Sequence, residues 1–189
     1  MRIRRFLSLT TGLFLFACGT AAAQEPGKTG LTMGFPGSIG IIWHATDKVA
    51  IRPDFTFSHS SLDGLSSVSG SSVSGSSFGT NISALLYLRK YDNVRTYFSP
   101  RFSYSRTSST VSVSSPTQGA LPEQTTTTSA SGGGGLFGVQ YSPAGRFSVF
   151  GEAGLTFSHR SAPASTISGT KLSSNGWGTT AGVGVIFYF

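Results

Sequence analysis

The sequence predicts an all-β chain that folds as an eight-stranded antiparallel up-and-down transmembrane β-barrel, with short periplasmic turns and long extracellular loops. Three observations predict it. Apolar and polar residues alternate with a period of two in eight segments, tight turns alternate with long polar connections, and charged residues within the expected membrane spans fall on one face only.

The N-terminus indicates export. Three arginines are followed by the apolar run Phe6 to Phe16, which is too short to span a bilayer, and then by three alanines before Gln24. We therefore expect a signal peptide over residues 1–23, cleaved after Ala23, and an outer-membrane β-barrel domain over residues 24–189.

The chain's single cysteine, Cys18, lies inside the expected signal peptide. The mature chain is therefore expected to form no disulfide and no cysteine metal site. Residues 15–18 partly resemble a lipobox, so lipidation of Cys18 is the alternative to cleavage after Ala23.

The composition suits a wall that faces lipid on one side. Removing the three signal arginines from the 14 basic residues leaves 11 against seven acidic ones, a net charge of +4, which is too small and scattered to indicate nucleic acid. Aromatic residues make up 12% of the chain, charged residues only 11%, and glycines number 25. After the signal peptide no apolar run is long enough for a membrane helix, so any span must be built from strands.

Eight strands are expected, in this order: 30–35, 38–44, 49–58, 79–89, 94–106, 134–141, 146–158, and a last strand that follows Asn175 and ends at Phe189. The tight connections are 36–37, 45–48, 90–93 and 142–145, each with turn-forming residues. Long Ser/Thr/Gly-rich connections follow the third, fifth and seventh strands. An even strand count places both chain ends on the periplasmic side.

The two faces of these strands differ in polarity. One face carries residues such as Ile51, Phe55, Phe102, Val149 and Phe187 and no charge, as expected for a surface in lipid. The opposite face collects the charged and amide residues Arg52, Asp54, Arg89, Arg95, Arg101, Glu152, Asn81 and Gln140. An eight-stranded barrel is just wide enough for side chains to fill its lumen, so these charges are expected to pair with one another.

The third, fifth and seventh strands share a local pattern, R-P-D-F-T-F-S-H, S-P-R-F-S-Y-S-R and E-A-G-L-T-F-S-H. Superposing them brings the charged positions to neighbouring levels of the interior. We expect an interior ion network of Arg52, Asp54, Arg95, Arg101 and Glu152; the alternative is that luminal water solvates each charge separately. Pro53 and Pro100 fall at one height and lack an amide hydrogen, which predicts a bulge or a local break in the ladder.

Basic residues follow the outermost aromatic residues of the same three strands. His59, Arg106 and His159 each lie two positions beyond an outward aromatic residue, where they would meet lipopolysaccharide phosphates. The alternative is that they are ordinary polar residues at strand ends. His44 is expected at the membrane interface beside Trp43.

No catalytic site, metal site or cofactor is expected. Serines adjoin both His59 and His159, but serine is abundant throughout and the carboxylates point to the opposite face, so a catalytic triad is not predicted. Metal ligands do not recur at a suitable spacing. The run Gly132 to Gly135 precedes no helix, so it is interpreted as a flexible entry to the sixth strand or a tight position in the wall.

Together, the signal peptide, the eight alternating strands, the turn rhythm and the aromatic terminus resemble the small bacterial outer-membrane β-barrel superfamily, including the OmpA transmembrane domain and the OmpX/Ail type. The resemblance covers residues 28–189. It implies that Phe187, Tyr188 and Phe189 form the signal read by the barrel assembly machinery, and that outer-membrane lipid and lipopolysaccharide surround a monomer.

Three functions follow as hypotheses. The first is a non-enzymatic structural or surface-interaction barrel, active in adhesion or envelope integrity through its loops, with polar and charged side chains filling the lumen. The second is a narrow porin-like pore for ions or small solutes, and the third, less favoured, is a lipid A-modifying enzyme. A secreted soluble β-sandwich is the alternative of a different class.

Overall fold

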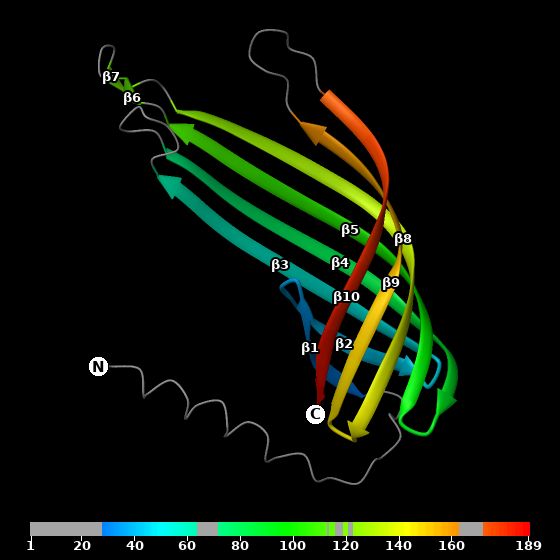
Figure 1. The fold of residues 1–189 in the computed structure, drawn as a ribbon. Coiled ribbons are helices and arrows are strands. Elements are labelled where there is room, and N and C mark those ends of the chain that lie inside the picture. Colours follow the sequence, from blue (N-terminus) through cyan, green and yellow to red (C-terminus); the bar gives the residue numbers. More distant parts are fainter. Residues whose placement is uncertain (1–27, 64–71, 113, 116–118, 121–122, 163–171) are drawn as a thin grey trace, which may run out of the picture.

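The computed structural model describes residues 28–63, 72–112, 114–115, 119–120, 123–162 and 172–189. Eight antiparallel strands form a closed barrel in the order β1-β10-β9-β8-β5-β4-β3-β2 (Figure 1). Their bounds are β1 Thr29–Phe35, β2 Ser38–Thr46, β3 Val49–Asp63, β4 Ser72–Tyr91, β5 Val94–Ser112, β8 Gln124–Ala144, β9 Phe147–Ala162 and β10 Leu172–Tyr188. Two-residue strands, β6 Ser114–Ser115 and β7 Gly119–Ala120, pair separately between β5 and β8. The predicted fold class is confirmed.

Several strands are longer than the sequence predicts. β5 and β8 pair without interruption from Pro100–Gly135 to Val111–Gln124, so much of the expected fifth-to-sixth loop is paired strand. The Ser/Thr stretches lack the alternation of apolar and polar residues that predicts a strand from sequence, but their backbone hydrogen bonds continue the ladder. Of the two interpretations of the glycine run, the wall position is confirmed, because Gly132 to Gly135 lie within β8.

The two prolines interrupt the ladder without a bulge. Two positions of β2 and β3 are unpaired between the residue pairs Gly40–Asp54 and Trp43–Ile51. The register of the two strands is the same before and after this gap. The same happens beside Pro100, between Ser83–Arg101 and Leu86–Phe98. Of the two predicted outcomes, the local break in pairing is confirmed, and the missing amide hydrogen is its cause.

The connections β2–β3, β4–β5 and β8–β9 gather at one end of the barrel, together with the C-terminal Phe189 (Figure 1). Lys28 lies there too, since it donates a 2.7 Å hydrogen bond to Gly145 between β8 and β9. We call this the turn end and the opposite one the loop end. Register shifts occur in β2, β4 and β8, all close to the turn end. The shift between Tyr87 and Arg89 turns the Arg89 side chain to the surface, where it donates a 3.1 Å hydrogen bond to Tyr91. The prediction that Arg89 faces the interior is therefore wrong.

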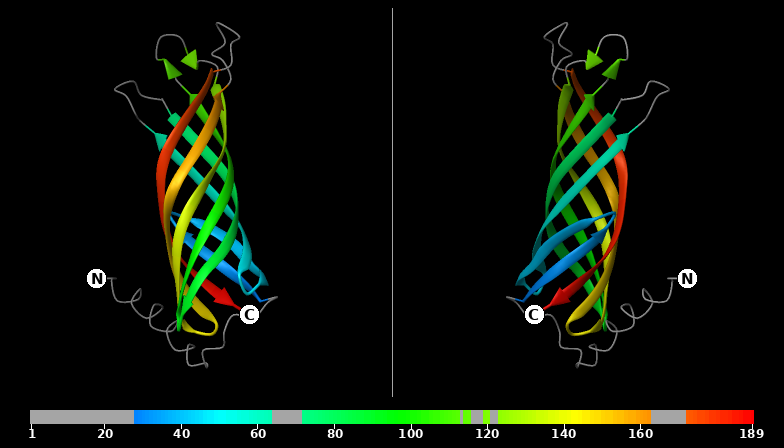
Figure 2. Two further views of the ribbon diagram at one scale, coloured as in Figure 1. Left: turned by 90° about the vertical axis from the view of Figure 1, so that its right-hand side faces the viewer. Right: turned by 90° about the vertical axis from the view of Figure 1, so that its left-hand side faces the viewer.

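The β1–β2 hairpin is much shorter than the other strands, so the wall is complete only in the half nearer the turn end (Figure 2). The hairpin closes at Pro36-Gly37, where Gly37 has a φ of 109° and donates a hydrogen bond to Gly34. Glycine adopts this backbone conformation without steric cost. Beyond the hairpin, β3 and β10 become the two edges of a six-stranded sheet.

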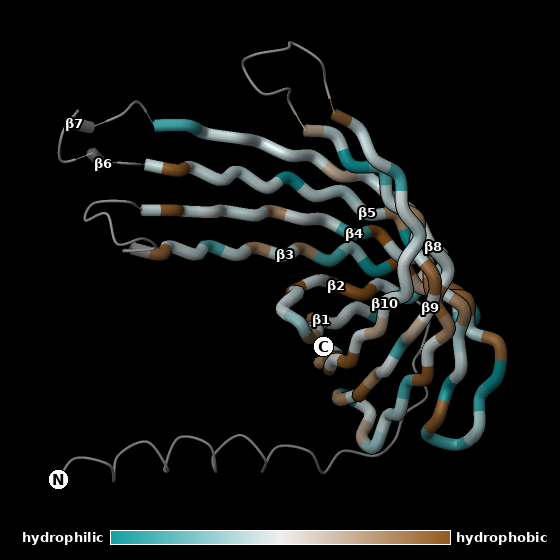
Figure 3. The backbone as a smooth tube through the Cα atoms, turned by 45° about the horizontal axis from the view of Figure 1, so that its top comes forward, coloured by the Kyte–Doolittle hydropathy of each residue, from teal (hydrophilic) through white to brown (hydrophobic). Residues whose placement is uncertain are grey.

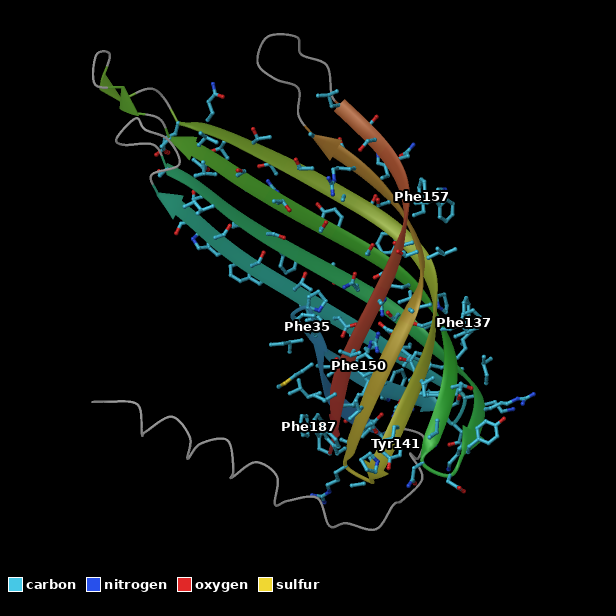
Figure 4. The ribbon with its side chains drawn as sticks, viewed as in Figure 1. Phe35, Phe137, Tyr141, Phe150, Phe157 and Phe187 are labelled. Atoms are coloured by element: carbon cyan, nitrogen blue, oxygen red, sulfur yellow. The ribbon has the colours of Figure 1, made fainter. Side chains whose placement is uncertain are left out.

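The outer surface is apolar from the turn end up to the exposed aromatic residues Phe57, Tyr104 and Trp177, and grows polar beyond them toward the loop end (Figure 3). We call this apolar part of the outer surface the apolar belt. Phe137 and Phe157 lie on the outer side of the wall, whereas Phe150 lies within the lumen (Figure 4). Within the described part of the chain, no helix is long and apolar enough to cross a membrane.

Candidate functional site in the barrel lumen

Large side chains close the lumen at its turn end. Ile42, Leu85, Tyr97, Ile186 and Tyr188 point inward and are almost completely buried. The prediction that polar and charged side chains fill the lumen holds only in part here, because these large apolar residues lie beside buried polar ones such as Arg95, Gln140 and Ser148. An eight-stranded barrel leaves just enough interior for side chains to fill, and aliphatic and aromatic groups fill it here.

A polar aromatic cluster continues this closure. His44 is fully buried, stacks on Tyr87 with ring centroids 5.6 Å apart, and lies 3.2 Å from the Tyr188 hydroxyl. Gln140 joins the cluster by accepting from Tyr87 at 2.9 Å and donating to Tyr188 at 3.1 Å. The expected interfacial position of His44 beside Trp43 is therefore wrong. His44 follows Ile42 by two residues, so strand alternation puts both side chains on the inward face. This pattern could have predicted the buried position of His44 from the sequence.

Above this closure lies a buried cluster of four charged residues. Glu152 accepts two hydrogen bonds from Arg52 at 2.8 and 2.9 Å and a further one from Arg101. Arg52 also pairs with Asp54 at 3.1 Å. The structure thus brings together Arg52, Asp54, Arg101 and Glu152, from three strands, with no net formal charge.

Neutral groups complete the cluster. Tyr97 donates to Glu152 at 3.2 Å, Thr32 donates to Asp54 at 3.1 Å, and Arg101 donates to Ser83 at 2.9 Å. The Arg52 guanidinium also lies 4.7 Å from the centroid of the Phe150 ring. Buried charges are expensive unless they are paired and hydrogen-bonded. These partners meet that requirement except at the Nη1 of Arg52, which has no hydrogen-bond partner among the described residues.

Arg95 lies outside this cluster. Its guanidinium sits 5.3 Å from the Tyr87 ring centroid, within the turn-end closure, and it forms no ion pair among the described residues. It is the one member of the expected network that the structure does not bring to the other four. Strand alternation predicts that a side chain faces the lumen, but it does not predict the height of that side chain along the barrel axis. Arg95 precedes the inward Ser99 on β5 and therefore lies closer to the turn end.

Toward the loop end the lumen opens into a cavity of about 510 Å³. The four charged residues lie on its lining, together with small polar residues such as Asn81, Ser103, Thr156 and Thr180. Farther up, a Cβ added at Gly176 or Gly178 would meet nothing within 4 Å. Small inward side chains therefore leave this half of the lumen unfilled.

The basic residues beyond the outer aromatic residues are exposed. His59, Arg106 and His159 lie in paired strands rather than at frayed ends. His159 lies 2.6 Å from the amide oxygen of Asn175 in the neighbouring strand. Their contact with lipopolysaccharide phosphates stays a prediction.

The three C-terminal residues divide between the two faces. Phe187 and Phe189 are exposed on the outer surface, while Tyr188 is buried in the lumen closure. In the described residues no carboxylate hydrogen-bonds to His59 or His159, and no group of three metal-ligand residues gathers.

No protein-family model and no curated protein matches the chain. Solved structures match its fold. A major outer membrane protein of Thermus thermophilus has a TM-score of 0.50 at 16% identity, over 86% of this chain and 98% of that one. CarO of Acinetobacter baumannii has a TM-score of 0.42 at 12% identity, over 89% and 100%. Ail, the attachment invasion locus protein of Yersinia pestis, has a TM-score of 0.41 at 15% identity, over 87% and 99%. The chain has the fold of the small outer-membrane β-barrels.

Proposed function

We propose that the protein is a non-enzymatic outer-membrane barrel that acts at the cell surface, in adhesion or envelope integrity. The observation that carries the proposal is the polar sheet that β3, β4, β5 and β8 build beyond the apolar belt (Figure 1). On its outer face, hydroxyl pairs join neighbouring strands: Ser108 with Thr127 at 3.2 Å and Thr110 with Thr125 at 2.9 Å. Such cross-strand pairs hold a broad hydroxyl-bearing surface in one conformation.

In this account the mature chain starts at Gln24, reaches the outer membrane by export, and is assembled there by machinery that reads Phe187, Tyr188 and Phe189. The turn end then faces the periplasm and the polar sheet faces outward. His59, Arg106 and His159 would contact lipopolysaccharide phosphates at the base of the sheet.

Excision of the outer part of the β5–β8 hairpin tests the proposal. Joining Thr107 to Thr128, which pair across β5 and β8, through an Asn-Gly turn removes residues 108–127 and keeps the barrel. We expect adherence of expressing cells to abiotic surfaces and to one another to fall, with unchanged amounts of protein in the outer membrane. Unchanged adherence would contradict the surface role.

A matched pair of variants locates the effect on one face of the sheet. Ser108→Ala with Thr110→Ala removes outward hydroxyls, and Thr107→Ala with Ser109→Ala removes the neighbouring inward ones. The outward pair should weaken adherence and the inward pair should not.

Conductance separates this proposal from a pore. The lumen closure by Ile42, Leu85, Ile186 and Tyr188 supports the prediction that protein in a planar bilayer shows no steady open channel. A steady, ion-selective conductance that changes with Tyr188→Ala would favour the pore instead.

A further inference from the structure

The short β1–β2 hairpin leaves an opening in the barrel wall on the side of the cavity. The last pairs that join the hairpin to its neighbours are Phe35–Val183 with β10 and Ser38–Thr56 with β3. In the described residues no pairing joins β3 to β10 beyond them. The tip of the hairpin and both edges, including Phe35, Gly37, Phe57, Ser58, Gly182 and Val183, line the 510 Å³ cavity.

The opening reaches down into the apolar belt. On β10 the exposed aromatic residue Trp177 marks the upper part of the belt, and it lies beyond Val183 toward the loop end. Val183 and Trp177 are six positions apart on β10, roughly 20 Å along the strand at ~3.3 Å per residue. At a strand tilt of ~40° this is roughly 15 Å along the membrane normal, so the unpaired edge extends over about the depth of the acyl chains of one leaflet. Figure 2 shows the blue hairpin ending well below the neighbouring strands.

Unpaired backbone groups at this depth need partners. Irregular or unpaired backbone is tolerated within a membrane only where protein covers it or where it lines a water-containing cavity. The cavity behind the β10 edge supplies such a space. It therefore has two openings, one toward the loop end and one toward the lipid.

The cavity floor determines what can bind there. Arg101 is the most exposed member of the charged cluster, with 16% of its side chain accessible, and Glu152 and Asp54 lie beside it on the cavity lining. The four charged residues pair with one another, so the floor has no net formal charge. The Nη1 of Arg52, which also lines the cavity, has no hydrogen-bond partner among the described residues. An unused cationic donor beside two carboxylates favours a head group that carries both signs. The aromatic and aliphatic residues around the side opening suit an acyl chain.

We propose that this cavity binds the head group of a single-chain zwitterionic lipid that enters sideways from the outer leaflet. The phosphate lies on Arg101, the cationic group lies toward the Asp54 and Glu152 carboxylates, and the chain leaves between Phe35, Phe57 and Val183. The cavity volume is within the range of small-molecule sites, so it holds a head group while the chain lies outside it.

The test uses the mature protein in nanodiscs of anionic two-chain phosphatidylglycerol, with lysophosphatidylcholine carrying a 14-carbon chain as the probe. Native mass spectrometry of protein released from the discs counts retained probe. The wild-type protein should retain one molecule, saturating as the probe is titrated. Thr180→Trp, which fills the cavity, should weaken retention at least tenfold, while the matched variant Thr179→Trp, on the outward face, should retain it unchanged.

A second variant tests the head group. Arg101→Gln removes a charged hydrogen-bond donor and should weaken retention by about 10- to 100-fold. Glycerophosphocholine, the head group without the chain, should not displace the probe. Displacement by it would mean a soluble ligand that enters from the loop end, and would overturn sideways entry. Wild-type protein without retained probe, or equal retention by Thr180→Trp, would overturn the site itself. Either result would leave the proposed surface function untouched, because neither measurement involves adherence.

Discussion

Glu152 is the centre of the buried charge cluster, and Glu152→Gln tests whether that cluster holds the barrel together. The substitution keeps the side-chain shape but removes the carboxylate that accepts from Arg52, Arg101 and Tyr97. The cluster then changes from no net formal charge to +1, with Asp54 alone opposite two arginines.

The expected loss follows from burial. Glu152 is only 8% exposed and Arg52 only 1%, so the small contributions typical of surface pairs do not apply. Removing one partner of a buried ion pair costs about 3–5 kcal/mol, because the remaining charge is left uncompensated. If luminal water solvated each charge separately, the loss would be about 1 kcal/mol or less.

The assay is equilibrium unfolding in urea of protein reconstituted in vesicles, followed by the fluorescence of its two tryptophans and by unboiled gel migration. The double variant Arg101→Gln with Glu152→Gln restores charge balance between Arg52 and Asp54. It should recover at least half of the stability that Glu152→Gln loses. A loss below about 1 kcal/mol for Glu152→Gln, or additive losses in the double variant, would refute the coupled cluster.

Three further outcomes are expected. Gly138→Ala should destabilise the barrel by about 1–3 kcal/mol, because the new Cβ would overlap the buried Tyr97 ring. Gly151→Ala should be neutral, because its Cβ would meet only Val183 at 3.9 Å. Equal losses of stability in urea unfolding would contradict the close packing of Tyr97 against Gly138. Phe189→Ser should lower the amount of protein in outer-membrane fractions, and normal levels of that variant would argue against the assembly signal. His59→Ala with His159→Ala should leave the acyl pattern of lipopolysaccharide unchanged by mass spectrometry, and an altered pattern would point to an enzyme.

Alternation along the strands predicted most of the wall. Because side chains point to opposite faces with a period of two, the sequence alone placed Arg52, Asp54, Arg101 and Glu152 on the inward face. Their levels came from superposing three similar strands, and four of the five expected residues do lie together.

The rest depended on pairing, which alternation does not reveal. A register shift beside Leu88 moved Arg89 to the surface, and polar strands continued well past the predicted ends because their ladder needs no apolar face. The cavity was also not predicted. Its signal was present in the small inward residues of β10, including Gly176, Gly178 and Thr180, which cannot fill a lumen.

Detergent-gel migration of protein from outer-membrane fractions, with and without boiling, tests whether the chain forms a closed barrel in the outer membrane. A folded barrel resists the detergent, so we expect the unboiled protein to migrate apart from the boiled protein. Identical migration of both samples, together with recovery of the protein from the periplasm or medium without detergent, would contradict the closed barrel and favour a soluble β-sandwich.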